Sequence, residues 1–148
     1  MITLFEKFRF YKNGSSASYS AIVLDSESKI KLLNMFVYSN PDFEGWLKYA
    51  EHMTICMGRL PEHLRRYWLD EEVTLTATYV GISDKSIAVK VDGFYTIDKV
   101  KSADKLESKT PHITLATNSI DATPKDSNFI TDWVKIEPVK LSGVVKEV

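Results

Sequence analysis

A His-x-Thr motif occurs twice in this chain of 148 residues, as His52-Met53-Thr54 and as His112-Ile113-Thr114. In each copy an apolar residue follows the threonine. On an extended strand the histidine and the threonine point to one face, and the apolar residues point to the other. Two such strands side by side would present two imidazoles and two hydroxyls to one cleft, a set that suits phosphodiester hydrolysis.

The chemistry of such a cleft follows from the residue types. Two histidines with ordinary pKa values near 6.5 can share the acid and base roles close to neutral pH. Each positioned proton transfer contributes about 10²–10⁴-fold to the rate. The hydroxyls of Thr54 and Thr114 would donate to the non-bridging phosphate oxygens, which gather charge in the transition state. No metal or other cofactor is required, since catalytic zinc needs at least three protein ligands and His63 is the only further histidine.

A structural interpretation competes with this one. Histidine and threonine also occur on half-buried strands without any catalytic role, and threonine favours strands in its own right. Roughly one or two shuffled sequences in a hundred of this composition would place threonine two positions after at least two histidines. The matching apolar positions in both copies favour the functional interpretation. Cys56 shares the expected face of His52 and Thr54, and we interpret it as a small packed residue at the floor of the cleft.

Composition narrows the class of protein. The chain has 44% hydrophobic and 26% charged residues and a net charge of −1, which predicts one soluble domain over residues 1–148. The balanced charge argues against a protein that covers long nucleic acids, but it permits a small phosphate-bearing ligand. The chain has a single cysteine, charged residues that interrupt the apolar N-terminal segment, and no apolar run long enough to span a bilayer. These features predict a cytosolic protein away from membranes.

The elements that must position the motifs can be read from periodicity and turn residues. Strands are expected at 19–25, 51–57, 73–80, 87–91 and 112–117, with one or two more in 134–148. Helices are expected after a cap at Ser26 or Ser28, at 62–68 and at 124–133. Each histidine strand then lies in its own mixed unit. We therefore expect an α+β fold of two pseudo-symmetric lobes, approximately 1–60 and 61–148, around a central cleft, with strands free to exchange between them.

The paired segments His52-Met-Thr-Ile and His112-Ile-Thr-Leu resemble the signature of the 2H (two-histidine) phosphoesterases. That resemblance implies two α+β lobes around a cleft and metal-independent action on RNA-type phosphodiesters and cyclic phosphates. A narrower resemblance is to the bacteriophage anti-CBASS nucleases, which degrade cyclic di- and trinucleotide messengers of bacterial antiphage defence. It rests on four segments: Phe10-Tyr11, Tyr19 to Asp25, His52 to Gly58 and Val73 to Gly81.

The resemblance implies catalytic roles for His52, Thr54, His112 and Thr114. It also implies a ligand of a few nucleotides, whose 2′-hydroxyl attacks the adjacent 3′–5′ phosphodiester in the host bacterial cytosol. The partner would thus be a cyclic oligonucleotide or another small nucleotide, bound by a monomer or a small homo-oligomer.

Aromatic side chains that could stack on bases can be proposed on physical grounds, since such stacking is worth about 1–3 kcal/mol per base. The candidates are Tyr11, Trp68 and Trp133, and Glu137 is a candidate for reading a base edge. The alternative for each aromatic is a place in the core.

Two other functions fit the sequence. One is a 2H-type hydrolase of 2′,3′-cyclic phosphates or RNA ends, as in RNA repair or tRNA metabolism. The other is a protein that sequesters a nucleotide messenger without cleaving it. Recovery of the ligand, intact or linearised, from the denatured protein would separate sequestration from catalysis.

Overall fold

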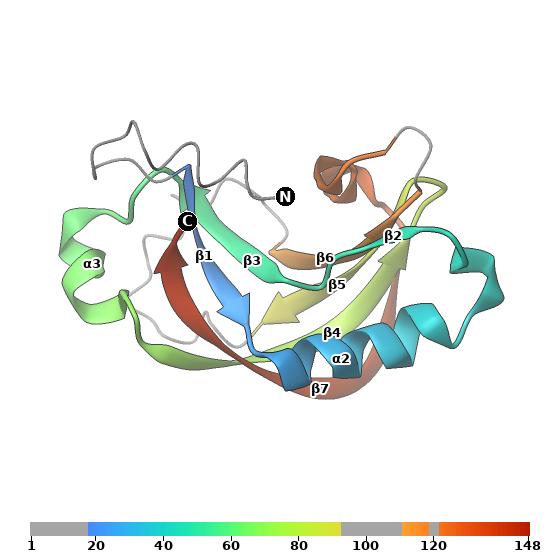
Figure 1. The fold of residues 1–148 in the computed structure, drawn as a ribbon, viewed down its shortest axis with the longest axis horizontal. Helices are drawn as coiled ribbons and strands as arrows, with labels where there is room; N and C mark the ends of the chain where they lie inside the picture. The colour runs from blue at the N-terminus through green and yellow to red at the C-terminus, as the bar shows by residue number, and fades with distance from the viewer. Residues whose placement is uncertain (1–17, 93–110, 119–121) are drawn as a thin grey trace.

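A closed antiparallel sheet dominates the computed structural model, which describes residues 18–92, 111–118 and 122–148. The strand order is β2-β6-β3-β1-β7-β4-β5, and β5 also pairs with β6. Six strands therefore close on themselves into a barrel, and the two-residue strand β2 extends it beside β6. Figure 1 shows the sheet as a strongly curved layer, with α2 lying along β7 and α3 at one end.

The elements have the following bounds. The strands are β1 (Tyr19–Leu24), β2 (Leu47–Lys48), β3 (His52–Met57), β4 (Glu72–Ile82), β5 (Ser86–Asp92), β6 (His112–Thr117) and β7 (Trp133–Glu147). The helices are α2 (Ser26–Leu33), which continues into the π-helical turn η1 (Asn34–Tyr38), then the 3-10 turn η2 (Pro41–Phe43), α3 (Glu62–Trp68) and the 3-10 helix η5 (Pro124–Phe129).

The expectation of an α+β fold with two pseudo-symmetric lobes around a central cleft is wrong. Helices are few and short among the described residues, whereas all seven strands found there belong to one sheet. Several pairs join strands far apart in sequence, such as β1 with β7 and β3 with β6. Local periodicity carries no information about such pairings, and therefore two motif strands in mixed surroundings do not distinguish two lobes from one closed sheet.

The core lies on one face of the sheet, and the helices complete it. Met53 of β3 pairs with Ile113 of β6, which pairs with Val89 of β5, and all three side chains are fully buried. Because side chains alternate along a strand, their neighbours in sequence point to the opposite face. The core therefore fixes the direction in which the histidines and threonines of both motifs project.

Helix α2 covers the edge of β7 that β1 leaves unpaired. Strand β1 pairs with β7 only from residue 143 onward. Just before that point, Ser142 donates its backbone N–H to Ser28 Oγ at 2.8 Å, and Lys31 Nζ donates to the Lys140 carbonyl at 3.0 Å. Asp25 caps the helix by accepting from the Ser28 N–H at 2.8 Å. The helix thus supplies hydrogen bonds that a neighbouring strand would otherwise provide.

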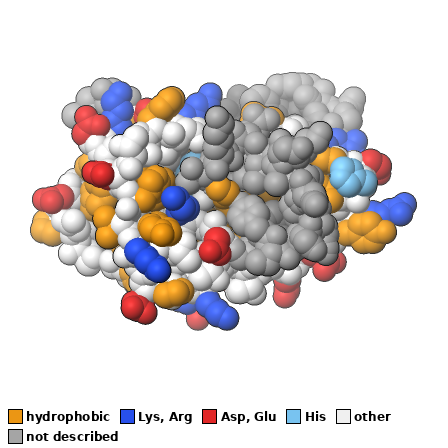
Figure 2. Space-filling view, turned by 180° about the vertical axis from the view of Figure 1, so that it is seen from behind, with side chains coloured by type: hydrophobic (Ala, Val, Ile, Leu, Met, Phe, Trp, Pro, Cys, Tyr) orange, Lys and Arg blue, Asp and Glu red, His pale blue; other side chains and the backbone are white. Residues whose placement is uncertain are grey.

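The described surface carries mixed charge. Figure 2 shows acidic and basic side chains interspersed with hydrophobic ones on the face seen from behind, without a broad field of one sign among its described residues. Within the described ranges, no helix has both the length and the apolar character needed to cross a membrane.

Candidate functional site

The chain bends sharply just before the first motif. Tyr49 and Ala50 donate their backbone N–H groups to the carbonyls of Leu115 (2.8 Å) and Thr114 (2.9 Å) of β6. The next pairing with β6 is Met53 with Ile113. Two residues between Ala50 and Met53 therefore have no partner on β6, where Thr114 and Ile113 are adjacent. Ala50 makes this possible by adopting a φ of 55°, in the left-handed region that residues with a Cβ rarely visit. Glu51 and His52 are the extra residues, and both line the pocket described below.

The two motif strands share a second irregularity, which repeats at the same place in each motif. Thr54 pairs with Ala21 and Cys56 with Ser20, so Ile55 is an extra residue in β3. Likewise Thr114 pairs with Ala88 and Ala116 with Ile87, so Leu115 is extra in β6. Both strands also begin with the same alternation of half-buried and buried residues. Bulges of this kind re-aim side chains and are frequent beside active sites.

The bulge in β3 also explains the position of Cys56. Strict alternation would place this thiol on the face of His52 and Thr54, but the extra residue Ile55 shifts the phase. Cys56 is buried in the hydrophobic core and does not line the pocket.

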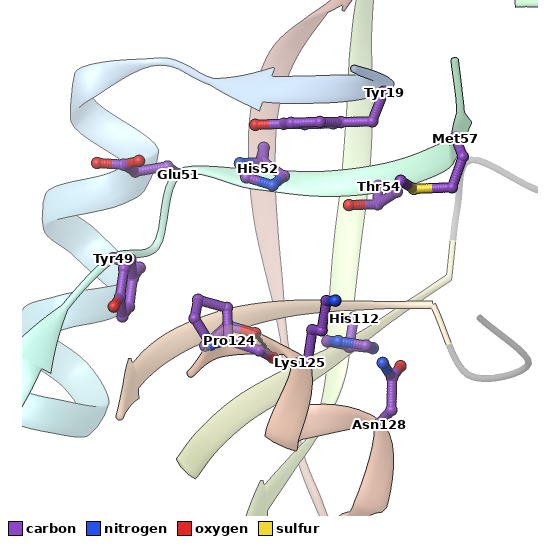
Figure 3. A pocket seen from close by; sticks show the side chains of 11 residues that line it. Tyr19, Tyr49, Glu51, His52, Thr54, Met57, His112, Pro124, Lys125 and Asn128 are labelled. Carbon is purple, nitrogen blue, oxygen red and sulfur yellow. Dashed lines mark hydrogen bonds between the residues drawn. The ribbon is translucent and has the colours of Figure 1, made fainter. Parts of the chain in front are cut away.

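A pocket of about 570 Å³ opens between the two motif strands, and all four motif side chains line it. Figure 3 shows His52 and Thr54 along β3, with His112 facing them from β6. The walls come from the start of β1, from the bend before β3 and from η5. The remaining lining residues are Tyr19, Tyr49, Glu51, Met57, Pro124, Lys125 and Asn128. The structure therefore brings together the side chains that the sequence predicted to meet.

His52 is held in a position that favours its neutral form. Burial lowers the pKa of this imidazole; nearby Glu51 partly offsets the effect, and His112 adds to it. The Tyr19 ring packs on the imidazole with 5.0 Å between ring centroids and an angle of 33° between the planes. At neutral pH the His52 side chain is therefore a neutral imidazole, able to accept a proton.

Thr114 is anchored to η5 through a chain of hydroxyls. Its Oγ1 lies 2.9 Å from Ser127 Oγ, and it is 3.4 Å from the Pro124 carbonyl. Ser127 Oγ in turn lies 3.4 Å from Ser86 Oγ on β5, and both serines are buried. This chain fixes η5 against β5 and β6, and so it fixes the two pocket residues that η5 carries.

Those two residues are Lys125 and Asn128, which Figure 3 shows beside His112. A capping box starts η5, where the Thr123 N–H donates to Asp126 Oδ2 at 2.9 Å. The sequence predicted a short helix here, but nothing in its spacing linked that helix to the motif strands. Tyr19 and Tyr49 were missed for the same reason, since only the long-range strand pairing brings them to the pocket.

The other predicted binding residues lie elsewhere. Tyr11 is outside the described residues. Trp68 is 8% exposed and belongs to the core, so the structure places it away from the pocket. Trp133 is half-buried at the start of β7, and Glu137 is exposed on the same strand; neither lines the pocket. Among the described residues, no cluster of three or more histidine, cysteine or acidic side chains is placed to hold a metal ion.

Comparison with known proteins bears on the fold alone. No family model matches the chain, and no curated protein matches it. Solved structures do match, among them the crystal structure of a fungal RNA kinase, with a TM-score of 0.55 and 14% sequence identity. The match covers 94% of this chain and 44% of that chain, so this chain spans less than half the length of that protein.

Proposed function

We propose that the pocket is the active site of a metal-independent phosphodiesterase that cleaves RNA-type 3′–5′ bonds in cyclic di- and trinucleotides. One observation carries this proposal: the imidazoles and hydroxyls of two His-x-Thr motifs, sixty residues apart in sequence, line the same pocket. The resemblance to anti-CBASS nucleases supplies the ligand class, and the biological role would be to counter bacterial antiphage signalling.

The proposed reaction is an in-line displacement at phosphorus. His52 takes the proton of a ribose 2′-hydroxyl, and the freed oxygen forms a bond to the adjacent phosphorus. The bond from phosphorus to the 5′-oxygen breaks, and His112 donates a proton to that leaving oxygen. The products are a 2′,3′-cyclic phosphate and a 5′-hydroxyl, so a cyclic ligand becomes linear. The lowered pKa of His52 supports its assignment as the base.

Stabilisation of the phosphate falls to the remaining polar groups of the pocket. Thr54, Thr114 and Lys125 line the pocket, and in this proposal their hydroxyls and ammonium bind the non-bridging oxygens. A hydroxyl carries one proton and rotates freely. The Thr114 hydroxyl lies 3.4 Å from the Pro124 carbonyl, to which it donates, and 2.9 Å from Ser127 Oγ, so its one proton would have to turn from these partners to a bound phosphate oxygen.

A second candidate is hydrolysis of 2′,3′-cyclic phosphates at RNA ends. The fold match to a fungal RNA kinase favours it, because an RNA kinase acts on RNA. The same four side chains would serve, with water in place of the 2′-hydroxyl as nucleophile.

One experiment tests both candidates. The purified protein is incubated in excess EDTA with 3′,3′-cyclic dinucleotides and, separately, with a 2′,3′-cyclic mononucleotide, and products are resolved by chromatography. His52→Ala and His112→Ala should each lower turnover by about 10²–10⁴-fold. His63→Ala is the matched control, because His63 is exposed on α3 away from the pocket. Near-normal turnover by both pocket variants would refute the assignment, and the preferred substrate decides between the candidates.

A further inference from the structure

A lysine held between two aromatic rings lies next to the pocket on the same face of the sheet. Lys90 Nζ is 4.8 Å from the centre of the Tyr79 ring and 5.0 Å from that of Trp133. Both distances are within the range of cation–π attraction. Two rings from different strands therefore restrict where this ammonium can be.

Strand register connects this cluster to the candidate active site. Lys90 of β5 pairs directly with His112 of β6 and with Tyr79 of β4. Directly opposed residues of antiparallel strands point to the same face, with their Cβ atoms about 5 Å apart. Lys90 is not among the residues that line the pocket, so it lies just beyond the pocket's edge on the His112 side.

The ring of Trp133 is seated on a glycine. Gly81 pairs with Trp133 across β4 and β7, and a Cβ at this position would come within 2.6 Å of Trp133 Cε3. Gly81 thus leaves the space in which the indole lies against the strand. The space for the ring is therefore part of the sheet itself.

Lys90 keeps its charge available. In the described part of the chain no carboxylate lies within ion-pair distance of Lys90 Nζ; its contacts there are the two rings. An aromatic face attracts a cation without neutralising it. A half-buried, immobilised ammonium beside a phosphate-cleaving site is suited to bind a second phosphate.

We infer that Lys90, held by Tyr79 and Trp133, forms a second phosphate subsite that receives the phosphate next to the scissile one. This inference rests on the proposed function and deepens it by assigning a binding place to the second phosphodiester phosphate of the ligand, with the exposed part of the indole of Trp133 against the neighbouring nucleotide. A mononucleotide 2′,3′-cyclic phosphate would leave the subsite empty.

Binding to a non-cleavable probe tests the subsite apart from catalysis. The probe is a fluorescein-labelled 2′-O-methyl RNA trinucleotide, which lacks the nucleophilic hydroxyl, and its Kd is measured by anisotropy over a range of salt concentrations. Lys90→Gln should weaken binding about fivefold at low salt. It should also reduce the slope of log Kd against log salt by about 0.7, the loss of one phosphate contact.

Two further variants test whether the effect of Lys90→Gln depends on the position of the lost charge and on the charge itself. Lys135→Gln removes the same charge from the same face, since Lys135 pairs with Tyr79. The ammonium of Lys135 makes no cation–π interaction with either ring, so this change should alter Kd by less than about twofold. Lys90→Arg keeps the charge and should restore most of the binding. Equal effects of the two glutamine variants, or no effect of Lys90→Gln, would overturn the subsite, as would failure of the wild-type protein to bind the probe.

Steady-state kinetics test the subsite independently of the binding measurements. Lys90→Gln should raise KM for a cyclic dinucleotide and leave KM for a 2′,3′-cyclic mononucleotide unchanged; an equal rise for both would count against the subsite. If the wild-type protein cleaves neither substrate, the proposed function fails, and the binding measurements still decide the subsite.

Discussion

Replacing Ser127 by alanine tests the hydroxyl chain that anchors Thr114. The change removes the 2.9 Å contact with Thr114 and the weaker 3.4 Å contact with Ser86. A hydrogen bond contributes about 0.5–1.5 kcal/mol net, and a buried polar group left without a partner costs about 1–3 kcal/mol. Ser86 is fully buried and loses its side-chain partner, so we expect Ser127→Ala to lower the free energy of unfolding by about 2 kcal/mol.

Urea unfolding followed by circular dichroism measures this loss. The midpoint should fall with an unchanged m-value, because the surface exposed on unfolding stays the same. A loss of about 2 kcal/mol corresponds to a drop in Tm of about 4–8 °C for a chain of this size. The double variant Ser86→Ala/Ser127→Ala leaves neither serine hydroxyl behind, so it should lose about 1 kcal/mol less than the sum of the single losses. Additive losses, or a Ser127→Ala variant as stable as the wild type, would refute the reasoning.

The same variant connects stability with the proposed chemistry. If Ser127 orients the hydroxyl of Thr114 toward a phosphate, Ser127→Ala should lower kcat in the wild-type background. In a Thr114→Val background, where that hydroxyl is absent, the same change should have no further effect on kcat. An equal loss of kcat in both backgrounds would show that Ser127 does not act through Thr114.

Three further predictions follow from single groups. Burial keeps the pKa of His52 in the folded protein below its unfolded value near 6.5. The folded protein therefore binds fewer protons than the unfolded chain and loses stability as pH falls below about 6.5. His52→Gln should flatten that decline, which urea titrations at successive pH values would measure. Thr117→Val should raise the free energy of unfolding by about 1 kcal/mol, because Oγ1 of Thr117 is buried without a hydrogen-bond partner; equal or lower stability would contradict this. Gly81→Ala should displace the Trp133 ring and shift its fluorescence, and an unchanged spectrum would show that the ring does not depend on the glycine.

The sequence predicted local elements well and their assembly poorly. The strand His112–Thr117 and the helix Glu62–Trp68 have the predicted bounds, since both are marked by clear periodicity and by a proline directly before them. The closed sheet was not predicted, because it depends on pairings such as Ile22 with Val145 that no local pattern encodes. Length and strand count do not distinguish a closed sheet from two lobes.

The candidate site was predicted where alternation along a strand sufficed. Buried Met53 and Ile113 fix the outward direction of the motif side chains, and their apolar character is legible in the sequence. The bend at Ala50 could not be predicted from the sequence, because alanine, unlike glycine, does not indicate a left-handed backbone conformation. The contribution of η5 was also hidden, since Lys125 reaches the pocket only through the packing of that helix on β5 and β6.

The joint between β3 and β6 has a consequence for how a ligand changes the whole molecule. Between β3 and β6 one residue pair is formed, Met53 with Ile113, whereas β4 and β7 pair along most of their length. A ligand that contacts both motif strands would add interactions between the two barrel strands that share the fewest backbone pairs. Its occupancy should therefore register as a higher melting temperature of the entire sheet, even in variants that have lost all turnover.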